Sequence, residues 1–108
     1  MRRELLPIGS VVRLKDVDRS MMICGFAPTG PAKPGYVYDY SGFLYPEGYG
    51  ETLEVYQFDN EQIELVQAIG YQDRETFRYM EALQETIMDV KEKTAAQFAE
   101  NNGAGSKE

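Results

Sequence analysis

The chain contains no histidine, no tryptophan and only one cysteine. Without histidine it lacks the side chain that most often acts as a general base near neutral pH, and the commonest metal ligand. The same absence excludes the serine and cysteine nucleophiles that depend on an imidazole partner. The single cysteine, Cys24, cannot form an intramolecular disulfide, and its apolar surroundings indicate a buried, inert thiol. We therefore expect a protein that is not an enzyme and binds no metal and no cofactor.

Long apolar runs are also missing. No segment approaches the ~20 residues that a membrane-spanning helix requires. The first residues include two arginines but no apolar stretch of the length found in a signal peptide. We therefore expect a cytoplasmic protein that does not insert into membranes.

Positive charge is scarce in the second half of the chain. Residues 1–50 carry six Lys/Arg and five Asp/Glu, whereas residues 51–108 carry five and thirteen, out of totals of 11 and 18. An acidic surface repels phosphate backbones and anionic lipids, so nucleic acid is not an expected partner. The natural complement is a basic patch on a protein.

The length of 108 residues, with 43% apolar residues, is sufficient for one small domain. Alternating apolar residues predict a strand at 11–15, and an apolar run predicts a second at 21–26, which together suggest a hairpin. Prolines and glycines make 27–35 a loop, and alternation of tyrosine with other residues predicts a strand at 36–40. Residues 41–50 are aromatic, rich in glycine and predicted to be irregular.

Further along, residues 53–58 indicate a short strand. Asp59 is a candidate cap for a single helical turn, and 64–71 are favoured as the last strand. The predicted fold is therefore α+β: a small, bent antiparallel sheet or partial barrel at residues 1–72, followed by a long C-terminal helix.

The helix is predicted for residues 73–102, with Asp73 as its N-cap, and residues 103–108 are predicted to form a disordered tail. One apolar stripe recurs at spacings of three and four: Phe77, Met80, Leu83, Ile87, Val90, Thr94 and Phe98. A helix of about 29 residues is about 43 Å long, whereas a module of ~70 residues measures some 25–30 Å. We therefore expect part of the stripe, including position 87, to lie beyond the module and to contact another helix.

Several short motifs occur in a distinctive order: residues 6–12 (LPIGSVV), 21–23 (MMI), 39–40 (DY), 45–48 (YPEG) and 58–59 (FD). In this order the chain, over residues 5–75, resembles a family of small proteins of Gram-positive bacteria catalogued as domain of unknown function 4176. Members tend to be encoded beside type VII secretion genes and toxins with an LXG-type N-terminal domain. The resemblance implies a targeting chaperone, or other accessory protein, for such a toxin.

Eight of the thirteen aromatic residues lie between positions 36 and 58. They can fill the core of a small barrel, or form a recognition surface, for which tyrosine is well suited. Two carboxylates in this stretch, Asp39 and Glu47, are also candidates for acid–base catalysis, although the sequence supplies no nucleophile or metal site nearby. The candidate partner-binding residues are Tyr45, Glu47, Tyr49, Leu83, Ile87, Val90 and Phe98.

Three functions remain open from the sequence. A chaperone or export adaptor would bind the helical N-terminal region of a secreted toxin, and self-association through the stripe is a further possibility. An immunity protein would instead bind and block the toxic domain. An enzyme would use Asp39 and Glu47, a hypothesis that the absence of histidine disfavours.

Overall fold

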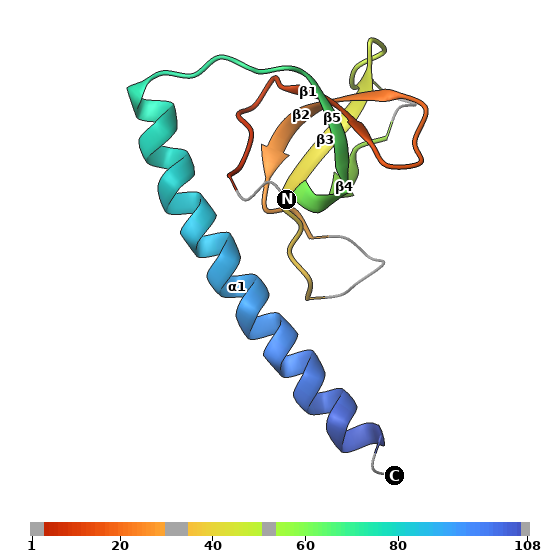
Figure 1. Cartoon of the computed structure of the whole chain (residues 1–108), viewed down its shortest axis with the longest axis vertical. Coiled ribbons are helices and arrows are strands. Elements are labelled where there is room, and N and C mark those ends of the chain that lie inside the picture. The colour runs from red at the N-terminus through yellow and green to blue at the C-terminus, as the bar shows by residue number, and fades with distance from the viewer. Residues whose placement is uncertain (1–3, 30–34, 51–53, 107–108) are drawn as a thin grey trace.

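The computed structural model describes residues 4–29, 35–50 and 54–106, with side chains up to Thr94. An open, antiparallel five-stranded sheet is followed by one long helix (Figure 1), which confirms the predicted α+β fold. The strands are β1 (Val11–Leu14), β2 (Ser20–Phe26), β3 (Tyr40–Tyr45), β4 (Tyr56–Phe58) and β5 (Ile63–Ala68). A short 3-10 turn (Asn60–Gln62) precedes β5, and the helix α1 spans Arg74–Ser106.

The strand order is β4-β3-β2-β1-β5, so the last strand returns to pair with the first. The predicted hairpin is present, with Val12 opposite Met21. Register shifts occur between β1 and β5 and between β2 and β3. Such irregularities bend strands and increase their twist, which allows this small sheet to curve around its core.

The predicted strand at residues 36–40 is wrong in position. Residues 36–39 contribute only an isolated bridge, between Val37 and Thr29, and the regular strand β3 begins at Tyr40. Most of β3 therefore lies within residues 41–50, which we predicted to be irregular because they are rich in glycine. Gly42 explains the difference: a Cβ there would lie 2.8 Å from the carbonyl oxygen of Met22 and 3.0 Å from the ring of Phe58. The missing side chain thus permits close packing within the sheet rather than interrupting it.

The helix begins where the sequence predicted. The carboxylate of Asp73 accepts a hydrogen bond of 2.8 Å from the backbone N–H of Thr76, which is the arrangement of an N-cap. At the other end α1 continues to Ser106, four residues beyond the predicted end. The helix includes Gly103 and Gly105, and each glycine costs a helix only about 1 kcal/mol relative to alanine, so neither stops it by itself. Of the predicted tail, residues 107–108 lie outside the described residues.

The core is formed by the inner face of the sheet, the N-terminal segment and α1. Its buried residues are Leu5, Leu6, Val12, Leu14, Met21, Ile23, Tyr40, Phe58, Met80 and Ile87. Ile87 is 3% exposed, so the expectation that position 87 lies beyond the module is wrong. The reason is that Leu5 and Leu6 lie in the same core cluster as Met80 and Ile87 and extend the surface on which the helix packs.

The molecule is elongated because of its helix. Its radius of gyration is 15.4 Å, against about 13 Å expected for a compact chain of this length. A 33-residue helix is about 50 Å long at 1.5 Å per residue, and the longest dimension of the molecule is 49 Å. Figure 1 shows the C-terminal part of α1 continuing past the edge of the sheet.

A substitution in the docked part of the helix tests this arrangement. Ile87→Asp places an unpaired charge in the core and should lower the free energy of unfolding of the whole domain by about 3–5 kcal/mol. Met88→Asp is the matched control, because Met88 is 53% exposed on the same helix and should change stability by less than about 0.5 kcal/mol. Urea denaturation measures both. An Ile87→Asp protein with wild-type stability would show that α1 does not dock.

Candidate partner-binding site

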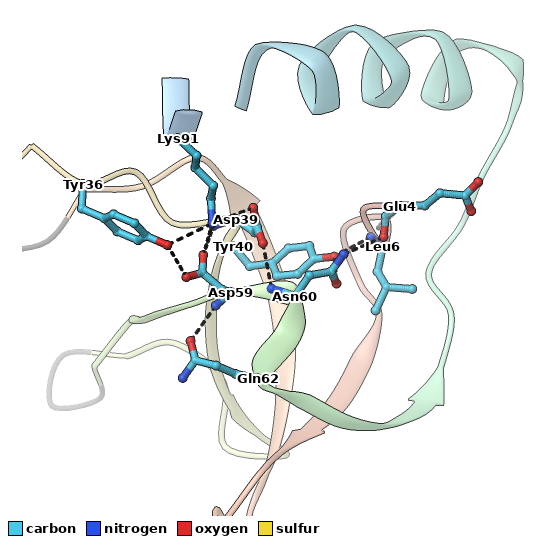
Figure 2. A network of polar contacts seen from close by, with 9 residues as sticks. All are labelled: Glu4, Leu6, Tyr36, Asp39, Tyr40, Asp59, Asn60, Gln62 and Lys91. Atoms are coloured by element: carbon cyan, nitrogen blue, oxygen red, sulfur yellow. Dashed lines mark hydrogen bonds and ion pairs between the residues drawn. The ribbon is translucent and has the colours of Figure 1, made fainter. Parts of the chain in front are cut away.

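A charged cluster holds the helix against the sheet. The ammonium group of Lys91, on α1, lies 2.6 Å from Oδ1 of Asp59 and 3.3 Å from Oδ1 of Asp39 (Figure 2). It also donates a hydrogen bond of 3.2 Å to the hydroxyl of Tyr36, which in turn donates one of 2.6 Å to Oδ2 of Asp59. We call Tyr36, Asp39, Asp59, Asn60 and Lys91 the polar latch.

Strand pairing brings the two carboxylates together. Tyr40 of β3 lies opposite Phe58 of β4, so the residues just outside this pair, Asp39 and Asp59, are neighbours at one end of the two strands. The backbone N–H of Asp39 donates a 3.0 Å hydrogen bond to Asp59. The backbone N–H of Asn60 donates one of 2.8 Å to Asp39. Two adjacent carboxylates repel each other, so these donors and the cation of Lys91 are what make the arrangement stable.

A second set of hydrogen bonds continues the latch to the N-terminal segment. The buried hydroxyl of Tyr40 donates to Oδ1 of Asn60 (2.7 Å) and accepts from the backbone N–H of Leu6 (2.8 Å). The side-chain amide of Asn60 donates to the carbonyl oxygen of Glu4 (2.8 Å). Leu5 completes the connection, since its backbone N–H donates to Oε1 of Gln84 on α1. The sheet, the N-terminal segment and the helix are therefore joined by one continuous polar network.

The latch changes the acidity of its own members. Of the effects that act on the pKa of Lys91, burial is the largest single one, and it lowers that pKa. The hydrogen bonds with Asp59 and Tyr36, and the negative charge of the two carboxylates, outweigh burial and raise that pKa well above 10.5. Burial and the hydrogen bond to Asp59 likewise raise the pKa of the Tyr36 hydroxyl above 10.0. Lys91 is therefore a cation under physiological conditions, and its ion pairs with Asp39 and Asp59 persist.

Three of the predicted partner-binding residues lie at the other end of β3, far from the latch. Tyr45 and Tyr49 are exposed, and Glu47 forms an ion pair with Arg19. The hydrogen bond from Arg19 is the main reason that the pKa of Glu47 is lowered. These residues form a surface separate from the docked helix.

The four predicted helix residues are divided by the docking of α1. Leu83 is half-buried and packs against the core, as Ile87 does more deeply, while Val90 is half-buried near Lys91. Phe98 lies beyond the side chains that the structure describes. The part of the stripe at 80–87 is therefore occupied by the chain's own module.

The two carboxylates considered for catalysis are not brought together. Asp39 directly precedes β3 and Glu47 follows it, so six strand residues separate them, or about 20 Å at the usual rise. Paired carboxylates that act on one bond lie within about 10 Å of each other. Among the described residues, no group of three side chains from His, Cys, Asp and Glu is placed to hold a metal ion.

Sequence reasoning missed the latch. Lys91 follows Ile87 by four residues, so it places a charge beside the apolar stripe on the docking side of α1. That charge was a usable signal that acidic side chains lie opposite. Which acids they are depends on the pairing of β3 with β4, which the sequence did not predict correctly.

The fold and the latch define a small α+β protein in which one long helix is locked to an open antiparallel sheet. Residues 5–79 match the family described as domain of unknown function (DUF4176), and the chain belongs to this family. No curated protein and no solved structure matches the chain. Within the residues that were searched, no helix has the length and apolar character needed to cross a membrane.

The latch predicts a specific loss of stability. Lys91→Met leaves two neighbouring carboxylates without their cation and should lower the free energy of unfolding by about 2 kcal/mol, less than for a fully buried pair because Lys91 is 25% exposed. Lys93→Met is the matched control, since Lys93 makes only an exposed pair with Asp89 and should cost less than about 0.5 kcal/mol. The double variant Lys91→Met/Asp59→Asn should recover part of the lost free energy of unfolding. Equal stability of the two lysine variants in urea denaturation would contradict the latch.

The latch also predicts a loss of stability in alkali. Because the folded-state pKa values of Lys91 and Tyr36 are raised, their contribution is complete below about pH 10 and is lost as the pH rises through the folded-state values. Unfolding free energies measured at about pH 8 and about pH 11 should therefore fall more for the wild type than for Lys91→Met. An identical decrease for both proteins would show that Lys91 is not linked to folding.

Proposed function

We propose that the protein is a non-enzymatic adaptor: a targeting chaperone that binds the helical N-terminal region of an LXG-type toxin exported by type VII secretion. The observation that carries the proposal is the length of α1. Among the helix side chains that the structure describes, up to Thr94, Lys91 is the last to pair with residues at the end of the sheet, and the backbone of α1 continues for fifteen residues to Ser106. The chain belongs to the family. Its resemblance to this family implies a role as a toxin accessory protein, and this supports the same partner.

The free end of the helix has the pattern of a docking surface. In sequence, Phe98 follows Thr94 and Val90 at the spacing that continues the apolar stripe. A stripe that continues along a helix in this way can be stabilised by packing against another helix. A helical targeting region presents such a stripe, and packing the two together buries both.

A second contact is proposed at the opposite end of the sheet. Tyr45 and Tyr49 are exposed there beside Glu47, and tyrosine rings anchor partners at a low cost in conformational entropy. Ile87, although part of the predicted stripe, contributes by holding α1 in place rather than by touching the partner.

Co-purification with separately expressed N- and C-terminal fragments of a co-encoded toxin tests the function. Only the N-terminal fragment should be retained. Phe98→Asp should weaken that binding at least tenfold, while Gln97→Asp, which adds the same charge one residue outside the stripe spacing, should weaken it far less. Retention of the C-terminal fragment alone would favour an immunity protein. Retention of neither, with normal toxin export in a deletion strain, would contradict both functions.

A further inference from the structure

A cleft lies where the chain leaves β5 and enters α1. Figure 1 shows this junction at the end of the helix opposite to the C-terminus. We call it the junction cleft. It has a volume of about 350 Å³, at the small end of the range for ligand-binding pockets. Its apolar lining is formed by Ile8, Phe26, Tyr71, Tyr79 and Met80.

The rim of the junction cleft exposes large apolar side chains. Tyr71 is 79% exposed, Tyr79 is 59% exposed and Ile8 is 54% exposed. Exposed apolar residues are ordinary when scattered, but several around one cleft indicate a binding surface. Tyrosine is also the residue type enriched among the strongest contacts of protein interfaces.

Contacts within the fold anchor the backbone beside the junction cleft. A Cβ at Gly70 would lie 2.1 Å from the carbonyl oxygen of Ile8, so only glycine permits the close approach of these two segments. The N–H of Gly70 donates a 3.0 Å hydrogen bond to the buried hydroxyl of Ser10. On the other wall, the rings of Phe26 and Tyr79 pack at 6.5 Å between centroids. An anchored backbone beside a cleft lowers the entropic cost of binding a partner there.

The charge of the junction cleft is negative. Its only charged lining residues within the described part of the chain are Asp73 and Glu75. Asp73 accepts from the N–H of Thr76, which lowers its pKa, so it remains a carboxylate. Tyrosine rings beside carboxylates form a complementary environment for a cation, because the ring face attracts positive charge and the carboxylate pairs with it.

We infer that the junction cleft binds an arginine side chain of a partner protein, with an apolar neighbour of that arginine packed on the exposed rings. The planar guanidinium stacks on aromatic faces and pairs with carboxylates in a way that lysine does not. This inference goes beyond the proposed function, because it rests on a different surface and holds whether or not the partner is a toxin.

A short peptide supplies the probe. Amide NMR spectra of the isotopically labelled full chain are followed during titration with acetyl-Leu-Arg-Leu amide, and with the same peptide containing citrulline in place of arginine. Citrulline keeps the planar shape of the guanidinium but has no charge. The arginine peptide should shift the amides of Ile8, Phe26, Tyr71 and Tyr79, and should bind about threefold to tenfold more tightly than the citrulline peptide.

Two variants should weaken binding of the arginine peptide several-fold, Glu75→Gln by removing a charge and Tyr79→Ala by removing a ring. The matched controls are Glu85→Gln, on the same helix but outside the cleft, and Tyr56→Ala, an exposed tyrosine of β4 that is also outside the cleft. Both controls should bind as the wild type does. Equal binding of the two peptides, shifts confined to other parts of the protein, or an equal loss in the controls would each overturn the inference.

Discussion

The structure depends on one cation placed between two carboxylates. Asp39 and Asp59 are neighbours because β3 and β4 pair in antiparallel fashion. Two neighbouring negative charges oppose folding unless a positive charge compensates them. Lys91 of α1, which lies 32 residues after Asp59 in the chain, provides the compensation. The same contact that makes the end of the sheet stable therefore also holds α1 in place, together with Met80 and Ile87 in the core.

The position of α1 in turn determines which surfaces are available. The first part of the helix covers the core with Met80 and Ile87 and leaves the junction cleft beside its first turns. The C-terminal part of α1 continues past the edge of the sheet (Figure 1), and in sequence the stripe continues to Phe98. The exposed tyrosines Tyr45 and Tyr49 lie at yet another place, on the end of β3. The docking of α1 thus distinguishes the buried, stabilising part of the helix from the exposed surfaces of the molecule.

Much of the fold was predictable from local patterns. The hairpin of β1 and β2, the N-cap Asp73 and the long helix follow from alternation, capping chemistry and periodicity, all of which act over a few residues. The segment around β3 was predicted less well. Glycine and tyrosine do not by themselves specify one local structure in this segment. Gly42 permits close packing inside a strand, whereas Gly48 adopts a positive φ of 77° in a turn.

The sequence by itself determined the elements, the acidic balance of the second half and the existence of an apolar helix face, because these depend on composition and spacing along the chain. Only the tertiary structure decided that Ile87 faces the core, that Lys91 pairs with Asp39 and Asp59, and that the β5–α1 linker forms a cleft. Each of these results joins segments far apart in sequence, and no local propensity specifies which of them meet. Strand register and helix docking make that choice, and both are set by the packing of the whole core.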